Sequence, residues 1–151
     1  MSENINVRPA RIDDAKVIAA FNCAMALETE NKTLEPTRVE NGVRRMLQEP
    51  GRGFYLLAEL DGTIQACLMV TYEWSDWRDA DFWWIQSVYV APEARRKGLY
   101  SALHKTIKSL AIKQKSCGVR LYVEKQNTRA QNTYQKLGMR ECEYLMYEEA
   151  L

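Results

Sequence analysis

A glycine turn between two apolar runs constrains the fold of this chain more than any other feature. Phe54 to Leu60 and Ile64 to Tyr72 are rich in apolar, β-branched and aromatic side chains, and Asp61-Gly62 joins them. Asp-Gly favours the tight turn that links two antiparallel strands. The sequence therefore predicts a β-hairpin, so a sheet must form part of the fold.

Further strands and helices are predicted on both sides of the hairpin. Before it come a strand at Ile5–Arg8, a helix capped by Asp13 and Asp14, and a second helix opened by a Thr37–Glu40 capping box. After it come a strand at Phe82–Val90, a helix over Leu99–Ala111, a strand at Val119–Val123, a helix at Arg129–Leu137 and a strand at Met139–Tyr147. This order predicts an α/β sandwich with a mixed sheet, in a single domain over residues 1–151.

The charge balance excludes some classes of partner. Lys and Arg number 21 and Asp and Glu number 20, a formal charge of +1. A nucleic-acid binder needs a surplus of cations, so nucleic acid is not an expected partner. No apolar run approaches the roughly 18 residues that span a bilayer, and Met1–Asn6 is polar. We therefore expect a cytoplasmic protein without a membrane partner.

Cysteine and histidine offer little material for metal or nucleophile chemistry. The four cysteines, Cys23, Cys67, Cys117 and Cys142, form no CxxC pair, and His104 is the only histidine. Scattered cysteines in a reducing compartment are expected as free thiols. No metal site is predicted, so any catalysis must use positioning, backbone donors, carboxylates and tyrosines.

A basic turn leads directly into the helix that begins near Leu99. Arg95, Arg96 and Lys97 precede Gly98 in this turn. The free N–H groups and the dipole at a helix start attract anions, and a glycine lets the backbone approach a phosphate. Such a turn is also typical of a plain solvated loop, and the turn alone leaves both interpretations open.

A second motif favours the anion site. Asn127, Ala130, Tyr134, Gly138 and Met139 fit the pattern Asn-x-x-Ala-x-x-x-Tyr-x-x-x-Gly-hydrophobic. Together with Arg95 and Gly98, which fit Gln/Arg-x-x-Gly-x-Gly/Ala after a strand, these residues make the chain resemble the GNAT superfamily of acyl-CoA-dependent N-acyltransferases. The resemblance covers essentially the whole chain and implies a central sheet that splays apart between its fourth and fifth strands.

The resemblance implies acetyl-CoA as co-substrate and assigns its binding residues. The pyrophosphate would lie on the turn and helix start: Arg95, Arg96, Lys97, Gly98, Leu99, Tyr100 and Ser101. Tyr100 departs from the family's usual Gly or Ala, and its ring must point away from the phosphates. The pantetheine arm would bond the backbone of Val88 and Val90 like an added strand. Asn127 would bond a pantetheine amide, cap the helix that it precedes, or do both.

Tyr134 is the predicted general acid. When an amine attacks the thioester, sulfur leaves as a thiolate that needs a proton. A phenol with a pKa near 10 keeps its proton at neutral pH and can supply it. Tyr134 follows Asn127 by seven residues, about two helical turns, so both side chains face the same way. A tyrosine that only packs the core is the alternative.

The acceptor amine must lose a proton before it attacks. For a lysine-like amine at pH 7 this costs ~4.6 kcal/mol, which a nearby carboxylate can lower. Glu28 and Glu73 are the candidate bases, because the segments Glu28–Glu30 and Glu73–Arg78 usually line the acceptor side in this family. Carboxylates close to Trp83 and Trp84 also suit a small cationic amine, although solvated loops and core tryptophans explain the same residues.

These observations predict an N-acetyltransferase that moves acetyl from acetyl-CoA to a primary amine by direct attack in a ternary complex. Two alternatives are an acyl-CoA-binding sensor without catalysis and a protein acetyltransferase acting on lysines or N-termini. The expected partner is a small-molecule amine, and a homodimer is left open as an assembly.

Overall fold

The computed structural model describes residues 3–151. The chain divides into two compact units, the first ending at Leu121 and the second covering Tyr122–Leu151. The first unit holds the sheet and most helices: β1 (Ile5–Pro9), α1 (Ala15–Glu30), α2 (Pro36–Gln48), β2 (Gly53–Leu60), β3 (Thr63–Ser75), β4 (Ala80–Val90), α3 (Leu99–Lys113) and β5 (Gly118–Arg120). Two short 3-10 helices, η1 (Ile12–Asp14) and η2 (Pro92–Ala94), precede α1 and α3, and the second unit holds α4 (Thr128–Lys136).

The sheet has the order β1-β2-β3-β4-β5, with β4 and β5 parallel and the other neighbours antiparallel. The predicted α/β class with a mixed sheet is confirmed. Asp61 (φ 50°) and Gly62 (φ 85°) both take left-handed backbone conformations in the turn between β2 and β3. These angles are the ones a two-residue hairpin turn needs, so the predicted hairpin is confirmed as well.

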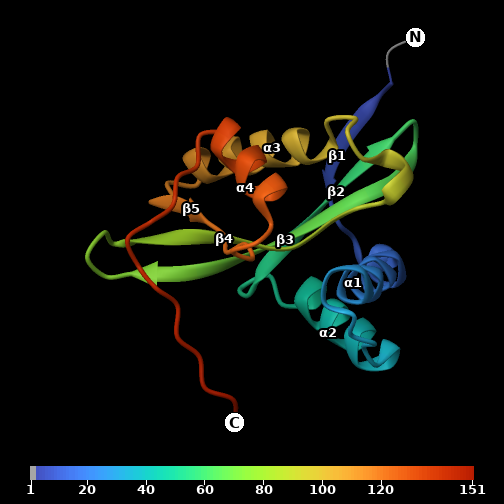
Figure 1. The fold of residues 1–151 in the computed structure, drawn as a ribbon, viewed down its shortest axis with the longest axis horizontal. Coiled ribbons are helices and arrows are strands. Elements are labelled where there is room, and N and C mark those ends of the chain that lie inside the picture. Colours follow the sequence, from blue (N-terminus) through green and yellow to red (C-terminus); the bar gives the residue numbers. More distant parts are fainter. Residues whose placement is uncertain (1–2) are drawn as a thin grey trace. The chain divides into compact units, whose positions relative to one another are not determined.

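Helices cover both faces of the sheet, with α3 on one face and α1 and α2 on the other (Figure 1). Successive side chains of β2 alternate between these layers: Leu56 and Ala58 pack in the cluster with α3, whereas Tyr55 and Leu57 pack with α1 and α2. Below, we call these two sides the α3 face and the α1/α2 face. Each face buries its own apolar core.

The apolar stripe predicted on the long helix forms the inner side of α3. Leu99, Leu103, Ile107 and Ala111 are all buried against the sheet. Their three-and-four spacing brings them onto one side of the helix. This packing holds the first turn of α3 at the end of β4.

The capping box predicted at Thr37 and Glu40 is wrong. Helix α2 begins at Pro36, and the carboxylate of Glu35 accepts hydrogen bonds from the backbone N–H groups of Thr37 and Arg38 at 3.0 and 2.8 Å. Pro36 has the φ that a first helical residue needs and no N–H to satisfy, so the helix starts there. Glu40 instead pairs with Arg44 one turn along.

The strand predicted at Met139–Tyr147 is also wrong, because the described residues form no strand there. Tyr144 to Tyr147 are all highly exposed. These four side chains are bulky without alternating with polar ones, so no single face of a strand is favoured for burial. The strand predicted at Val119–Val123 is shorter than expected and ends at Arg120.

Strands β4 and β5 pair over three residues only. The pairs run from Phe82 with Gly118 to Trp84 with Arg120. The rest of β4, Ile85–Val90, has no β5 partner in the described chain. Strand β5 ends at Arg120, so β4 continues beyond Trp84 without it.

Within the described residues, no helix is long and apolar enough to cross a membrane. All four cysteines are free thiols. His104 is buried on α3.

Candidate active site

Strand β4 carries a β-bulge just beyond its last pair with β5. Tyr89 lies opposite Cys67 of β3, whereas Gln86 lies opposite Met69, so the two β4 residues between them face one residue of β3. Ser87 takes a left-handed conformation with φ 51°. A bulge bends the strand that carries it and increases its twist. The bend lies just beyond the residues of β4 that pair with β5.

Val88 and Val90 present backbone polar groups along the free edge of β4. The N–H of Ala91 donates to the carbonyl oxygen of Gln65 at 2.8 Å, so the polar groups of Ala91 face β3. Because these groups alternate between the two edges of a strand, those of Val90 and Val88 face the open side. Both valine side chains pack with the core of the α3 face.

The turn between β4 and α3 gathers backbone N–H groups. Arg96 and Gly98 take left-handed conformations, with φ 64° and 85°, and Gly98 is the N-cap residue of α3 without a side-chain cap. Several N–H groups in this turn donate to no acceptor in the described chain; they belong to Arg96, Lys97, Gly98, Leu99 and Ser101. Clustered N–H groups at a helix start, reinforced by the helix dipole, form an anion-binding site.

The three cations of this turn have different partners. Arg95 forms an ion pair with Glu28 of α1 at 2.6 Å, and its Nε donates to the Val90 carbonyl oxygen at 3.0 Å. Lys97 pairs with Glu3 at 3.0 Å. Arg96 forms no ion pair with any described residue, so its charge is the most available to a bound anion.

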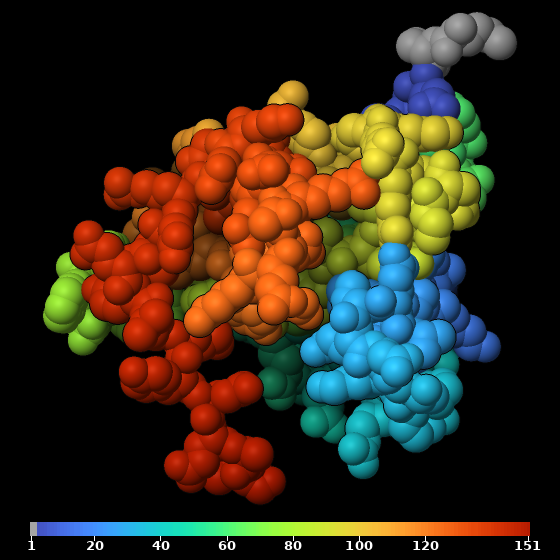
Figure 2. All heavy atoms as spheres, viewed as in Figure 1, coloured from blue at the N-terminus to red at the C-terminus, as the bar shows by residue number. Residues whose placement is uncertain are grey.

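The Arg95–Glu28 pair fastens the turn to the end of α1. In Figure 2 the light-blue surface of α1 meets the yellow surface of this turn. The guanidinium of Arg95 lies 5.7 Å from the centre of the Tyr89 ring. The hydrogen bond from Arg95 lowers the pKa of Glu28, and the same bond raises the pKa of Arg95. Glu28 is therefore a weaker base than an unpaired glutamate.

Tyr100 turns its ring along α3. Its hydroxyl lies 3.2 Å from Nδ1 of His104 one turn further on. Burial lowers the pKa of His104, and the nearby Lys108 lowers it further. A neutral imidazole can accept a hydrogen bond from the hydroxyl, so this contact holds the ring beside the helix.

Glu73 lies in a cluster of charged and aromatic side chains on the α1/α2 face. It forms an ion pair with Arg120 of β5 at 2.6 Å. The Arg120 guanidinium stacks 3.6 Å from the centre of the Phe82 ring, and Arg78 lies 5.0 Å from the same ring. The two arginines bring more positive than negative charge to this part of the face.

The tryptophans of this region differ in burial and in the face of the sheet on which they lie. Trp83 is buried in the core of the α3 face, whereas Trp74 and Trp77 are 60% and 87% exposed. Trp84 lies opposite Thr71 of β3, and Gln86 donates to the hydroxyl oxygen of Thr71. Trp84 and Gln86 therefore belong to the α1/α2 face, next to the free edge of β4.

In the second unit, Asn127 caps α4 by accepting a hydrogen bond from the N–H of Ala130 at 3.1 Å. Tyr134 lies two turns along the same helix and is partly buried. Burial raises the pKa of Tyr134 above its usual value near 10. The phenol therefore keeps its proton at neutral pH, as a general acid requires.

Sequence reasoning missed the bulge at Ser87 and the arginine partners of both candidate bases. No local pattern marks a bulge, because its position depends on which residues of β3 and β4 pair. The Arg95–Glu28 and Arg120–Glu73 pairs join residues 67 and 47 positions apart. No local pattern in the sequence marks either pair.

Comparison with known proteins identifies the family. The profile of the acetyltransferase (GNAT) family matches residues 20–139. A crystal structure described as "a possible acetyltransferase from Clostridium difficile 630" has 45% sequence identity and a TM-score of 0.91, covering 97% of each chain. Among curated proteins there is no significant match.

More distant structures share the fold alone. Ribosomal-protein-alanine N-acetyltransferase from Brucella melitensis biovar Abortus 2308 has 14% identity and a TM-score of 0.80, covering 98% of this chain and 99% of its own. A predicted acetyltransferase with acetyl-CoA from Clostridium acetobutylicum has 14% identity and a TM-score of 0.78, covering 97% and 96%. The family match and the 45% identical structure together show that this chain is a member of the GNAT acetyltransferase family and an acyltransferase.

Proposed function

We propose that this protein transfers an acetyl group from acetyl-CoA to the primary amine of a small molecule. The observation that carries the proposal is the cluster of N–H donors at the start of α3, directly after the free edge of β4. A pyrophosphate suits the N–H groups, and an extended amide-bearing arm suits the open strand edge. Acetyl-CoA carries both groups, and members of the family use it as the acyl donor.

The predicted cofactor-binding residues receive distinct roles. Phosphate oxygens accept bonds from the N–H groups between Arg96 and Ser101, and the Arg96 side chain, which forms no ion pair with a described residue, adds charge. Arg95 keeps the turn in place through Glu28. The backbone of Val88 and Val90 bonds the pantetheine arm, and Asn127 bonds a pantetheine amide through the side of its amide group not used for capping.

Transfer proceeds by direct attack in a ternary complex. The neutral amine nitrogen bonds to the thioester carbonyl carbon, the carbon–sulfur bond breaks, and Tyr134 donates its phenolic proton to the leaving sulfur. The amine nitrogen gives up its own proton to a base. The raised pKa of Tyr134 supports its role, because the phenol is protonated at neutral pH.

Both candidate bases pair with an arginine at 2.6 Å. Arg95 lowers the pKa of Glu28, so we assign Glu28 to positioning the turn. Glu73 stays the candidate base, acting through water beside Arg120. The sequence favours a cationic acceptor because of these carboxylates, but their arginine partners offset that negative charge. We therefore keep the primary amine as the acceptor class without requiring further positive charge.

Thiol release from acetyl-CoA, measured with a panel of primary amines, tests the proposal. We expect amine-dependent release by the wild type and about a 100-fold lower turnover for Tyr134→Phe, because a general acid contributes that much. The Kd for acetyl-CoA should stay within about twofold, since the phenyl ring is retained. The exposed Tyr147 supplies the control, Tyr147→Phe, which should act like the wild type.

Two outcomes would contradict the proposal. Tight acetyl-CoA binding without release for any amine would favour a sensor, and acetylation of protein lysines or N-termini alone would favour a protein acetyltransferase. Full turnover of Tyr134→Phe would remove Tyr134 from the proton transfer and leave the acetyltransferase activity standing.

A further inference from the structure

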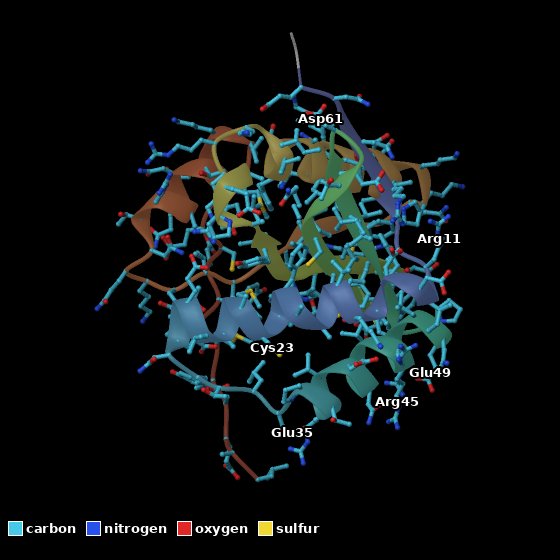
Figure 3. All side chains as sticks on the ribbon, turned by 90° about the vertical axis from the view of Figure 1, so that its right-hand side faces the viewer. Arg11, Cys23, Glu35, Arg45, Glu49 and Asp61 are labelled. Carbon is cyan, nitrogen blue, oxygen red and sulfur yellow. The ribbon has the colours of Figure 1, made fainter. Side chains whose placement is uncertain are left out.

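An open groove of about 570 Å³ lies in the first unit, between the C-terminal part of α2 and strands β2 and β3. In Figure 3, Arg45 and Glu49 are labelled at the C-terminal end of α2. The residues that matter for its chemistry are Gly42, Arg45, Gly51, Arg52, Tyr55 and Thr71. No Asp or Glu lines this groove in the described chain, so its polar lining consists mainly of hydrogen-bond donors.

Two guanidinium groups give the groove its charge. Arg45 is exposed and forms no ion pair with any described residue. Arg52 pairs with Glu49, whose side chain is itself 47% exposed. Two arginines against one carboxylate leave a net positive charge at the rim. A guanidinium binds carboxylate and phosphate oxygens through paired N–H donors.

Two hydroxyl groups reach the groove from the sheet. Tyr55 is 4% exposed, and its hydroxyl makes no hydrogen bond to a described residue. Burial raises the pKa of Tyr55 to about 12, so the hydroxyl keeps its proton. Thr71 accepts a bond from Gln86 and still has its own O–H to donate. The Tyr55 hydroxyl is not sealed from solvent, so a ligand or a water molecule in the groove can accept its hydrogen bond.

Two glycines keep the groove open. Gly42 lies in the interior of α2, where glycine costs a helix about 1 kcal/mol relative to alanine. A Cβ at Gly42 or Gly51 would meet no atom within 4 Å, so packing does not require glycine at either place. Neither residue has a positive φ. A larger side chain at either position would extend into open space at the groove.

The groove adjoins the part of β4 where acetyl transfer is proposed. Thr71 lies opposite Trp84, and Met69 lies opposite Gln86, all on the α1/α2 face. Neighbouring strands are about 4.8 Å apart, so a group bound over β3 is only a few bonds from one bound over β4. One small molecule can therefore occupy both positions.

We propose that this groove binds an oxyanionic group, a carboxylate or a phosphate ester, on the acceptor whose amine is acetylated. The inference rests on the proposed function and names its substrate class: compounds such as amino acids or aminoalkyl phosphates, with a few bonds between amine and anion. Arg45, Arg52 and Tyr55 are the specificity-determining residues. Gly42, which has no side chain, leaves space in the groove for the ligand.

Matched pairs of acceptors test the substrate class. Each amino acid is compared with its carboxamide, and each aminoalkyl phosphate with its alcohol, at equal concentrations of neutral amine. We expect kcat/KM to be at least tenfold higher for the anionic member, since a hydrogen bond to a charged group contributes that much. Whichever pair discriminates more identifies the anion as carboxylate or phosphate. Equal kcat/KM within all pairs would overturn the inference while leaving acetyl transfer intact.

Two variants test the groove itself. Arg45→Gln should raise the KM for anionic acceptors about tenfold and leave the Kd for acetyl-CoA unchanged. The control is Arg44→Gln, because Arg44 is a neighbour that pairs with Glu40 and does not line the groove. Gly42→Leu fills the space and should raise the same KM, although leucine favours the helix. A stable Gly42→Leu protein with wild-type KM would contradict the placement.

A binding measurement keeps the test independent of turnover. Arginine side-chain NMR signals are followed during titration with N-acetylglycine and, separately, with inorganic phosphate. We expect shifts at Arg45 and Arg52 that disappear in Arg45→Gln. If neither probe shifts these signals, the groove is not an oxyanion site, whether or not any amine is acetylated.

Discussion

At the scale of single residues, the conformation of Gly98 decides whether the turn can present its N–H groups. Its φ of 85° lies in the left-handed region, which side chains other than glycine rarely adopt. The next residue starts α3, so this angle sets the direction in which the first helical N–H groups point. Gly62 has the same φ in the β2–β3 turn, far from the N–H cluster in sequence.

The pair Gly98→Ala and Gly62→Ala separates strain from ligand binding. Both changes should lower the free energy of unfolding by about 1–2 kcal/mol, because each forces a Cβ into the left-handed region. Only Gly98→Ala should weaken acetyl-CoA binding, severalfold by calorimetry, and a bulkier residue there should weaken it more. Wild-type affinity in Gly98→Ala would argue against phosphates at this turn.

At the scale of elements, a buried carboxylate joins β1 to the start of α1. Asp14 accepts a hydrogen bond from the N–H of Arg11 at 2.7 Å and an ion pair from Arg8 at 2.9 Å. Arg8 also contacts Glu59 of β2 at 3.3 Å. The sequence predicted Asp14 as a cap for α1. Asp14 is the N-cap residue of α1, but its carboxylate bonds the backbone at the start of η1 rather than that of α1.

Asp14→Ala should lower the free energy of unfolding by ~2–3 kcal/mol, because Arg8 and the Arg11 N–H lose a buried partner. The exposed Asp13 is the matched control, and Asp13→Ala should change stability by less than about 0.5 kcal/mol. Denaturant unfolding of the three proteins measures both effects. Equal stability of the two variants would contradict a stabilising role for Asp14.

The Arg8–Asp14 ion pair predicts how the stability of the protein depends on pH. The hydrogen bond from Arg8 lowers the pKa of Asp14 in the folded protein. Its stabilisation is therefore fully present above the unfolded pKa of about 3.9 and is lost as pH falls through the lower folded value. The stability difference between wild type and Asp14→Ala should accordingly shrink in acid.

At the scale of the whole molecule, the two units differ in how many of their side chains are buried. The first unit packs two apolar cores against its sheet. In the second unit no described residue is buried, and α4 exposes most of its surface. A helix without a buried face opens locally at little cost, so α4 should be far less stable than α3.

Hydrogen exchange tests this difference and its link to the ligand. Amides of α4 should exchange much faster than those around Ile107 in α3 when acetyl-CoA is absent. Added acetyl-CoA should slow exchange in α4, because Asn127 and Tyr134 are proposed to contact it, and binding stabilises what it contacts. Unchanged α4 exchange at saturating acetyl-CoA would remove these two residues from the binding site.

Local patterns were enough to predict most of the elements. Asp61-Gly62 specifies its turn because few other residues accept two left-handed conformations in succession. The stripe from Leu99 to Ala111 specifies α3 because its spacing matches the helical period. The prediction failed at Met139–Tyr147, where a strand depends on a distant partner to complete its hydrogen bonds.

The sequence by itself determined the hairpin and the helix that follows the basic turn, because each depends on residues close together in the chain. It also indicated the GNAT family, through two motifs about 30 residues apart. Only the tertiary structure decided which charged side chains form ion pairs with one another. It pairs Glu28 with Arg95 and Glu73 with Arg120, and it leaves Arg45 beside an open groove without an ion pair to any described residue. The reason is physical: a carboxylate acts as a base or a salt-bridge partner according to which cation folding brings next to it, and sequence distance does not encode that contact.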